Sequence, residues 1–459
     1  MKKTATILLA ALLVFAGCSH DLPIKTKVPP RPAGVTDVLG LTVPAMDTVH
    51  VGFVGLGMRG SDAVVRYTYV PGAAITAICD VEPGRVEASQ RDLAERGCPP
   101  AAAYSGSEDS YRQLCENPDV DLVYICTDWV HHVPVALCAM EHGKHVAIEV
   151  PSAYSLEDCW ALVDMAEKTR LHCMILENCC YDFFELSALQ MAREGLFGEV
   201  VHAEGSYCHN LDPYWDAYWS NWRLDFNKEH RGDVYPTHGF GPVCQVLDIH
   251  RGDRLKTLVA LDTKAFNGPK HVAARGGADP EDFANGDVST TMIKTEKGKT
   301  VLIEHDVMTP RPYSRMYQLV GTEGYAAKYP VGQLCFRREA MEGGKADYRK
   351  LQGEEILTGE KLSAFMERHR SPILTPELEA LAKEVGGHGG MDFIMDYRLI
   401  YCLRNGLPLD MDVYDLAEWC SIGELSAISM ENGGAPVEVP DFTRGAWDRI
   451  KGFSYAFAE

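Results

Sequence analysis

Three closely spaced glycines form a candidate phosphate-binding turn. The apolar run Val49 to Val54 predicts a strand, and Gly55-x-Gly57-x-x-Gly60 follows it directly. Gly55 permits a tight turn, Gly57 lets the backbone approach a pyrophosphate, and Gly60 lets the next helix pack close to the strand. The N-terminus of that helix, expected over residues 61–69, would face the phosphates. The spacing therefore predicts a dinucleotide site.

An acidic residue lies where a dinucleotide site needs one. A second apolar run, residues 73–79, ends in Asp80, about twenty residues beyond the glycine turn. A carboxylate there would accept hydrogen bonds from the ribose hydroxyls and repel a 2′-phosphate, so we expect NAD as the cofactor rather than NADP. A chance glycine turn is the alternative interpretation, and the position of Asp80 argues against it.

The elements around this turn predict an α/β fold. Strands alternate with helices through residues 46–176, including the buried strand Asp121 to Cys126. This alternation is typical of a doubly wound parallel sheet with right-handed crossovers, the Rossmann arrangement. We therefore expect residues 46–176 to be an NAD-binding domain.

A second domain is expected over residues 177–459. Apolar and polar residues alternate in long runs, as at Val200 to Cys208 and Thr300 to His305. Such runs predict an α+β domain whose open, largely antiparallel sheet has one covered face. Residues 209–245 form a long segment rich in Trp, Tyr and His, and a connection of this length is usually functional.

The composition excludes some functions. The 459-residue chain has a net charge of −21 and no cluster of Lys and Arg, which argues against nucleic-acid binding. Its length suffices for two or three domains with large cores. None of its cysteines has the paired spacing of a zinc site, so we predict no metal site and assign no disulfide.

The N-terminus predicts a lipoprotein signal peptide over residues 1–18. A basic start precedes an apolar run that ends at Ala16 and is too short to span a membrane. Phe15-Ala16-Gly17-Cys18 resembles a bacterial lipobox, so we expect Cys18 to carry lipid; ordinary cleavage near Gly17 is the alternative. The proline-rich residues 19–45 predict a flexible tether. We thus expect an exported protein anchored in a membrane, in the periplasm or at the cell surface.

Two motifs in the first domain carry a family resemblance. They are Thr127-Asp128-Trp129-Val130-His131-His132 and Gly143-Lys144-His145-Val146-Ala147-Ile148-Glu149-Val150-Pro151. They resemble motifs of the glucose–fructose oxidoreductase / inositol dehydrogenase family, which joins a Rossmann domain to a second domain lining the substrate site. The sequence departs from the pattern of this family at two positions that handle protons in its members. Val150 stands in place of a lysine, and Val234 stands where an acid would precede His238 by four residues, which disfavours simple alcohol dehydrogenation.

A narrower resemblance accounts for these departures. The chain is similar to glycoside hydrolase family 109 in motifs that span most of its length: Glu149-Val150-Pro151, Glu177-Asn178-Cys179-Cys180-Tyr181, Tyr235-Pro236-Thr237-His238, Pro310-Arg311-Pro312-Tyr313-Ser314-Arg315 and Gly389-Gly390-Met391-Asp392. That family uses NAD to cleave α-N-acetylgalactosaminides. The resemblance therefore implies a glycosidase that acts on glycans ending in N-acetylgalactosamine.

The reaction implied by this family differs from that of ordinary glycosidases. NAD oxidises sugar C3, the C2 proton becomes acidic and leaves, and the aglycone is eliminated from C1. Water then adds and C3 is reduced again, so the cofactor is recycled and can stay bound. This chemistry needs proton-transfer groups at the C3 hydroxyl and at C2, but no pair of carboxylates flanking the glycosidic bond.

The resemblance also implies roles for individual residues. Besides the three glycines, the implied cofactor contacts are Met58, Arg59, Asp80, Trp129, His132, Glu149, Val150 and Asn178. The implied sugar contacts are Tyr207, Arg223, Tyr235, Pro236, Thr237, His238 and Tyr313. We expect His238 to move the proton of the C3 hydroxyl, because imidazole titrates near neutral pH, and Tyr181 is the weaker choice for the C2 base. Taken alone, Tyr181, Tyr207 and Arg223 would be typical of packing.

Two other functions stay open on the sequence alone. A periplasmic NAD-dependent sugar or inositol dehydrogenase would release NADH, and Val150 and Val234 disfavour it. A non-catalytic lipoprotein that binds sugar or nucleotide would use the same residue types. The sequence leaves the natural glycan, the aglycone and any self-association undetermined.

Overall fold

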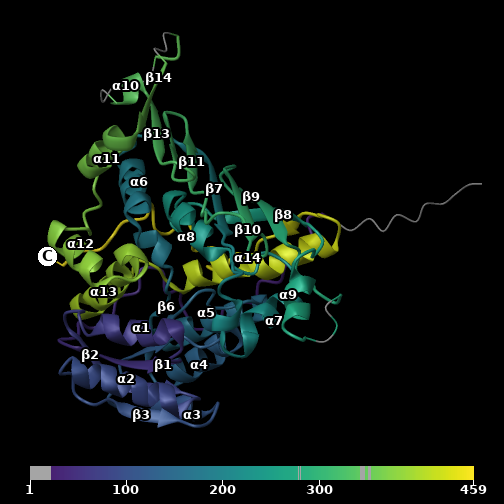
Figure 1. Cartoon of the computed structure of the whole chain (residues 1–459). Coiled ribbons are helices and arrows are strands. Elements are labelled where there is room, and N and C mark those ends of the chain that lie inside the picture. Colours follow the sequence, from purple (N-terminus) through teal and green to yellow (C-terminus); the bar gives the residue numbers. More distant parts are fainter. Residues whose placement is uncertain (1–21, 278, 280, 342–346, 350–352, 459) are drawn as a thin grey trace, which may run out of the picture.

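The computed structural model describes residues 22–277, 279, 281–341, 347–349 and 353–458. Figure 1 shows a parallel sheet with its helices at the bottom of the view and a larger open sheet above it. The long helix α14, Val413–Glu431, runs between the two sheets. The predicted signal peptide and Cys18 lie outside the described residues. Within the described ranges, no helix is both long enough and apolar enough to cross a membrane.

The first domain confirms the predicted doubly wound parallel sheet. Its strands pair in the order β3-β2-β1-β4-β5-β6. The strands are β1 Val49–Val54, β2 Ala73–Asp80, β3 Ala102–Ser105, β4 Leu122–Ile125, β5 His145–Ile148 and β6 Cys173–Ile175. The helices are α1 Met58–Tyr67, α2 Pro83–Glu95, α3 Ser110–Glu116, α4 Trp129–Glu141 and α5 Leu156–Thr169. Because helices cover both faces, β4 and β5 are wholly buried, which explains their uninterrupted apolar runs.

Side-chain caps fix where two of these helices begin. The Asp128 side chain accepts a hydrogen bond from the backbone N–H of His131 at the start of α4. The hydroxyl of Ser155 does the same for the N–H of Asp158 at the start of α5. Such caps satisfy N–H groups that have no partner within the helix. The first of them places Trp129 at the edge of the cofactor pocket described below.

The second domain confirms the predicted open, largely antiparallel sheet. Its strands pair in the order β14-β13-β12-β11-β7-β10-β9-β8-β15, and the pair β7–β10 is parallel. The strands are β7 Val200–Cys208, β8 Leu255–Asp262, β9 Val288–Thr295, β10 Thr300–Asp306, β11 Gln318–Gly321, β12 Gly324–Ala327, β13 Gln333–Arg337, β14 Glu354–Thr358 and β15 Val437–Glu438. Buried and more exposed residues alternate along β9, as expected for a sheet with one covered face.

Helices cover that face and fill the space between the sheets. α8, Thr237–Val246, packs against β7, and α14 packs against both β8 and α5. The remaining helices are α6 Phe183–Arg193, α7 Trp222–Glu229, α9 Gly268–Ala274, α10 Arg338–Met341, α11 Gly359–Arg368, α12 Pro376–Val385 and α13 Met391–Asn405. In the described part of the chain there are also four short 3-10 helices: η1 Asn178–Tyr181, η2 Trp215–Ala217, η3 Trp219–Asn221 and η4 His388–Gly390.

The segment before the first strand corrects one prediction. Residues 22–45, expected to form part of a free tether, lie on the body of the protein. Val38 and Leu39 are buried, and Arg31 donates to both carboxylate oxygens of Glu167 in α5. Proline excludes regular helix or sheet but not the burial of neighbouring side chains. Composition therefore indicated irregular backbone correctly and free movement wrongly.

Three further parts of the structure differ from what the sequence led us to expect. Residues 209–245 contain η2, η3, α7 and α8 in place of an irregular connection. The sequence did not indicate β3, a short edge strand whose residues are mostly exposed. The sequence predicted C-terminal helices but not the bounds of α14, because this helix is buried almost all round and so lacks the one-sided apolar stripe of a surface helix.

Candidate active site

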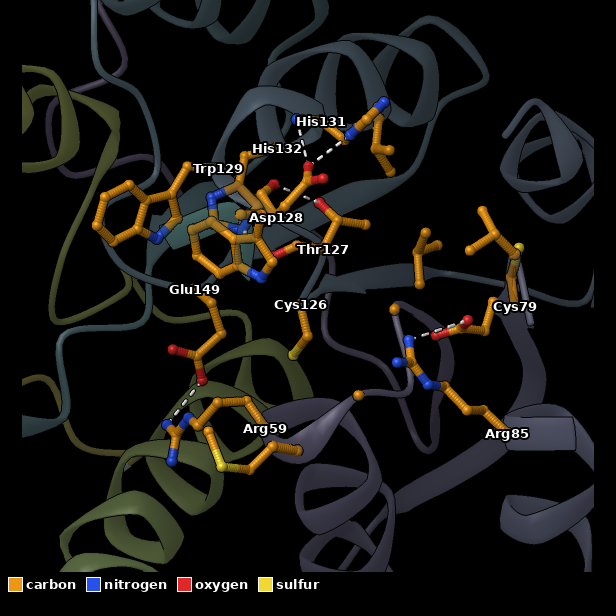
Figure 2. A pocket seen from close by; sticks show the side chains of 18 of the residues that line it. Arg59, Cys79, Arg85, Cys126, Thr127, Asp128, Trp129, His131, His132 and Glu149 are labelled. Carbon is orange, nitrogen blue, oxygen red and sulfur yellow. Dashed lines mark hydrogen bonds and ion pairs between the residues drawn. The ribbon is translucent and has the colours of Figure 1, made fainter. Parts of the chain in front are cut away.

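A cavity of about 440 Å³ opens at the carboxyl ends of β1, β2 and β4 (Figure 2). The strand order reverses here, which is the usual ligand position in an open parallel sheet. Gly55 has a φ of +89°, and a Cβ on Gly60 would collide with the carbonyl oxygen of Gly55. A Cβ on Gly57 would instead enter open space, 3.9 Å from Arg85. The turn thus requires glycine at two positions and leaves room for a pyrophosphate at the third.

Asp80 lies at the edge of this cavity, at the end of β2. Its carboxylate accepts hydrogen bonds from the backbone N–H groups of Leu56, at 2.6 Å, and Glu82, at 2.8 Å. Arg85 lies 3.4 Å away. Two fixed amide donors hold the carboxylate in one orientation beside the glycine turn. These residues fit the adenosine end of an NAD molecule.

The opposite wall of the cavity contains a buried ion-pair network. Arg59, in the first turn of α1, donates to Glu149 at 2.7 Å and to Asp392 at 2.8 Å; Figure 2 shows the first of these contacts. Burial alone would lower the pKa of Arg59, but the two carboxylates raise it well above its ordinary value. Asp392 belongs to α13, so the network joins the Rossmann domain to the second domain.

A histidine–carboxylate pair lies in the second domain. His238 is in the first turn of α8, and its Nδ1 lies 2.7 Å from Oε1 of the fully buried Glu177. Its Nε2 lies 3.3 Å from the hydroxyl of Tyr235. An ionised carboxylate can only accept hydrogen bonds, so the network assigns the proton to Nδ1. Nε2 is then left as a base.

Close backbone packing explains where His238 lies. A Cβ on Gly205 of β7 or on Gly239 of α8 would collide with the backbone of the other element. Without those side chains, the start of α8 lies directly on β7, and the rings of His238 and Tyr207 are 5.3 Å apart. Burial would raise the pKa of Glu177, but the positive charge and hydrogen bond of His238 outweigh it and keep that pKa below its ordinary value. Glu177 is therefore ionised at neutral pH.

Aromatic rings surround a buried arginine at the cavity wall. The guanidinium carbon of Arg223 lies 4.8 Å from the ring centroid of Tyr235 and 5.1 Å from those of Trp129 and Tyr218. It also donates a 2.6 Å hydrogen bond to the Tyr218 hydroxyl. The negative ring faces offset part of the buried charge. Because Arg223 also lines the cavity, its guanidinium is available to an oxygen atom of a ligand.

The environment of Tyr181 contradicts its predicted role. The side chain is fully buried, and its hydroxyl donates to Asp410 at 3.1 Å. The same carboxylate is held by two hydrogen bonds from Arg398. Burial and the nearby Asp410 raise the pKa of Tyr181 well above its ordinary value. A base must reach the proton that it removes, so the assignment of Tyr181 as the C2 base is wrong.

Most of the other predicted residues meet at the cavity. The lining includes Gly55, Gly57, Met58, Arg59, Asp80, Trp129, His132, Glu149, Val150, Arg223 and Tyr235. His132 is nevertheless held by the backbone, since its ring nitrogens lie 2.9 Å from the carbonyl of Pro151 and 3.1 Å from that of Thr127. Burial lowers its pKa, so a neutral His132 supports the loops of the cavity.

Besides Gly60, Tyr181, Tyr207 and His238, four further predicted residues lie outside the cavity lining. The Asn178 amide donates to Asp392 at 2.5 Å, so it supports the ion-pair network from behind. Pro236 and Thr237 are buried at the start of α8 and present His238 through their backbone. Tyr313 lies at the surface beyond Tyr207 and is treated below.

A second histidine–carboxylate pair was not predicted from the sequence. His388 Nδ1 lies 2.9 Å from Oδ2 of the fully buried Asp392 and 3.3 Å from a guanidinium nitrogen of Arg59. It belongs to Gly386-Gly387-His388-Gly389-Gly390, in which every residue has a positive φ. A histidine in this conformation is strained, and strain of this kind clusters at functional sites. A single histidine flanked by two glycines on each side was the available signal. The motif around Glu177 was noted, but its role as the partner of His238 was not.

One group of residues resembles a metal site in composition. Ligand atoms of Glu177, Cys179 and His238 lie within 4.8 Å of one another. The hydrogen bond between Glu177 and His238 already explains two of them, and the Cys179 thiol lies 3.4 Å from the side-chain oxygen of Asn178. Burial raises the pKa of Cys179 well above its ordinary value, which disfavours the thiolate that a metal needs. We assign no metal to this group.

Models of known families match both domains. Residues 49–176 match the oxidoreductase family with an NAD-binding Rossmann fold. Residues 181–449 match the C-terminal domain of glycosyl hydrolase 109. The two matches together cover the cavity lining, the aromatic wall, both histidines and Asp392, while Glu177 lies between the two matched ranges.

Curated proteins match over the full length. The chain is 57% identical to glycosyl hydrolase family 109 protein 1 of Bacteroides fragilis, with 100% of both chains covered. It is 58% identical to the protein of the same name from Bacteroides thetaiotaomicron, over 95% of this chain and 94% of that one. Among solved structures, a levoglucosan dehydrogenase in complex with NADH and L-sorbose superposes with a TM-score of 0.63 at 18% identity. That match covers 86% of this chain and 100% of the dehydrogenase and supports a shared fold.

Proposed function

The chain belongs to glycosyl hydrolase family 109, and we propose that it removes terminal α-linked N-acetylgalactosamine from glycans with an NAD that is recycled in each turnover. It is a glycoside hydrolase family enzyme with an NAD-binding Rossmann domain. The observation that carries the proposal is the buried His238–Glu177 pair next to the aromatic wall of the cofactor cavity. A base beside a dinucleotide site is the arrangement needed to oxidise a sugar hydroxyl.

The buried carboxylates around the site support this choice over ordinary glycosidase chemistry. Glu177 is paired with His238, and Glu149 with Arg59. Asp392 is paired with both Arg59 and His388. An ordinary glycosidase needs one carboxylic acid to protonate the leaving oxygen and a second carboxylate as nucleophile or base. Carboxylates held by cations in this way favour oxidation followed by elimination.

The cavity fits NAD through the glycine turn, which leaves space for the pyrophosphate, and through Asp80, which faces the ribose position. When bound, NAD supplies a reversible acceptor for hydride from a sugar carbon. Arg59 and Glu149 neutralise each other across the opposite wall. On the aromatic wall, the ion pairs found in the described part of the chain include none for Arg223, whose guanidinium is surrounded by rings.

His238 is the group that we assign to the C3 hydroxyl. Its Nε2 accepts the hydroxyl proton while Glu177 holds Nδ1–H, so the ring keeps its orientation as it becomes charged. Glu177 then stabilises the imidazolium. Arg223 is positioned to stabilise the negative charge that develops on the C3 oxygen when the C2 proton leaves.

His388 is the second proton-transfer group in this proposal. It is exposed, and it contacts Arg59, which lines the cavity. We assign to it the donation of the proton that the leaving oxygen at C1 requires. The C2 proton, which Tyr181 was predicted to take, passes instead to solvent water, because the Tyr181 hydroxyl is buried against Asp410. Asp392 orients His388 from behind in the same way that Glu177 orients His238.

A purified sample can test this function directly. A chromogenic α-N-acetylgalactosaminide, incubated without added NAD, should release its aglycone with no net formation of NADH. Turnover in heavy water should place deuterium at C2 of the released sugar, since that proton exchanges with solvent. Cleavage without label at C2, or normal cleavage of a 3-deoxy substrate, would overturn the mechanism. Stoichiometric release of NADH would instead support the dehydrogenase alternative.

We also propose that Cys18 carries lipid and anchors the exported protein in a membrane. The basic start, the short apolar run and the lipobox-like Phe15-Ala16-Gly17-Cys18 support this location. A Cys18→Ser variant should then move from the membrane fraction to the soluble fraction. A wild-type protein that is fully soluble, with no lipid mass on its N-terminus, would refute the anchor without touching the proposed reaction.

A further inference from the structure

A row of aromatic side chains leads from His238 to the protein surface. The hydroxyl of Tyr207, which packs on His238, lies 2.9 Å from Nδ1 of His209. The ring of His209 is 5.0 Å from that of Tyr313 and 5.5 Å from that of Tyr214. Tyr207 is 5% exposed, whereas Tyr313 is 40% and Tyr214 is 44% exposed. The row therefore begins beside the proposed proton-transfer group and ends in solvent.

The backbone around Tyr214 is fixed although its ring is exposed. Polar contacts hold the chain on either side of it: Asp212 lies 3.0 Å from Nε2 of His271, whose pKa is lowered by burial, and Asp216 forms an ion pair with Arg275 at 2.8 Å. The tryptophan that follows Tyr214 is fully buried. The partners in both contacts belong to α9 or follow it directly. Because the backbone that carries this exposed ring is already fixed, a ligand that binds the ring pays a smaller cost in conformational entropy.

The exposed rings lie at the solvent end of the row that begins at His238. His209 joins them to the reaction centre, because its ring lies 5.6 Å from that of Tyr207, which packs on His238. Burial and then the charges of Arg223, His238 and His388 lower the pKa of His209 to about 4. His209 is thus neutral near pH 7 and offers hydrogen bonds without charge. The leaving oxygen must lie beside the group that protonates it. The rest of the aglycone then extends outward, toward Tyr214.

We propose that Tyr214 forms a subsite for the sugar ring on the far side of the cleaved bond, next to Tyr313, which is the implied contact of the N-acetylgalactosamine. A hexopyranose presents a face of C–H groups, which pack on aromatic rings, while its hydroxyls bond polar groups such as His209. Neither tyrosine lines the cofactor cavity, so the dinucleotide does not occupy this surface. The inference rests on the proposed glycosidase function and specifies its substrate as a glycan of at least two sugars.

The test compares two substrates that differ only in the aglycone. One is the methyl α-glycoside of N-acetylgalactosamine, and the other carries the same sugar α-linked to a second hexose. Tyr214→Ala should lower the ratio of kcat/KM for the disaccharide to that for the methyl glycoside by about tenfold, mainly through KM; tenfold corresponds to about 1.4 kcal/mol. Tyr214→Phe keeps the ring and should keep the wild-type ratio. Arg275→Ala, which removes one brace, should lower the ratio by a smaller factor.

A matched control is available in the first domain. Tyr69 is 47% exposed, and Tyr69→Ala should leave the ratio at the wild-type value. If Tyr214→Ala changed neither substrate, or both by the same factor, the subsite would be refuted while the glycosidase function stood. A wild-type enzyme that cleaved neither substrate would overturn the proposed function and the subsite with it.

Discussion

The two histidine–carboxylate pairs of the candidate site differ in solvent exposure and in the backbone that carries the histidine. The His238 side chain is 12% exposed and lies in the first turn of a helix, 2.7 Å from Glu177. The His388 side chain is 56% exposed and lies among glycines of positive φ, 2.9 Å from Asp392. Both carboxylates are fully buried. A buried carboxylate therefore holds each of the two rings, and the rings differ in how much solvent reaches them.

This difference matches two different proton transfers. The proton taken from the C3 hydroxyl returns to the same oxygen when C3 is reduced again, so a shielded base such as His238 suffices. The leaving oxygen at C1 takes a proton that the next water must replace, so its donor needs contact with solvent, as His388 has. The comparison predicts distinct consequences when each pair is broken.

The largest effect is expected from His238→Ala. Loss of a general acid–base group should lower turnover by roughly a hundred- to ten-thousand-fold. The NAD content of the purified protein should stay near that of the wild type, because His238 is not among the residues lining the cofactor cavity. Turnover and bound NAD are measured on the same samples. Near-normal turnover, or a loss fully explained by missing NAD, would contradict the assignment.

His388→Ala should cause a loss that depends on the leaving group. With a methyl aglycone, which needs protonation, turnover should fall by roughly a hundredfold or more. With a 4-nitrophenyl aglycone, a good leaving group, the loss should stay within about tenfold, and exchange of the C2 proton with heavy water should continue. Equal losses on both substrates would show that His388 does not act on the leaving oxygen.

Glu177→Gln should reduce turnover by roughly a hundredfold, less than removal of the imidazole itself. The amide can donate to Nδ1 of His238, which would favour the tautomer whose Nε2 already carries a proton. Glu177→Asp keeps the anion and should restore part of the activity. If the Gln variant were as active as the wild type, orientation of the ring by Glu177 would be unimportant.

Asp392→Asn should lower turnover on the methyl glycoside by about tenfold, through weaker orientation of His388. Asp396→Asn is the matched control, because Asp396 is equally buried on α13 but bonds Arg66 and Tyr124 and has no contact with His388. Only the first variant should change the dependence on the leaving group. The same dependence in both variants would indicate a general loss of stability.

The smallest effect concerns stability in acid. Burial would raise the pKa of Asp392, but Arg59 and then His388 hold it well below its ordinary value. Its ionisation therefore stabilises the fold above about pH 4, and this contribution is lost as the pH falls further. Burial raises the pKa of Asp396 to about 6, so its contribution has the opposite slope between about pH 6 and 4. Urea unfolding of the two Asn variants at pH 3 to 7 should show these opposite changes of slope.

The sequence determined the features that depend on short-range chemistry. The spacing of Gly55, Gly57 and Gly60 after an apolar run identifies the phosphate turn, because the geometric demands of that turn fall on neighbouring residues. Asp80 and the alternation of strands and helices followed from the same local patterns. The NAD-binding domain and the fold class, which these features predicted, were both confirmed. The packing of residues 22–45 against the body of the protein could not be read in this way, since it depends on surfaces of α5 and β15 far along the chain.

Only the tertiary structure decided which polar groups meet. Arg59 and Asp392 are 333 residues apart in sequence and 2.8 Å apart in space, and nothing in either local motif specifies the other. Tyr181 was the weaker of the two predicted proton-transfer groups, and packing buries its hydroxyl against Asp410, whereas the ring of His238 lies at the site beside Tyr235. Proton-transfer chemistry depends on ångström distances and on burial. Both are properties of how α8, α13 and β7 pack, which no local spacing encodes.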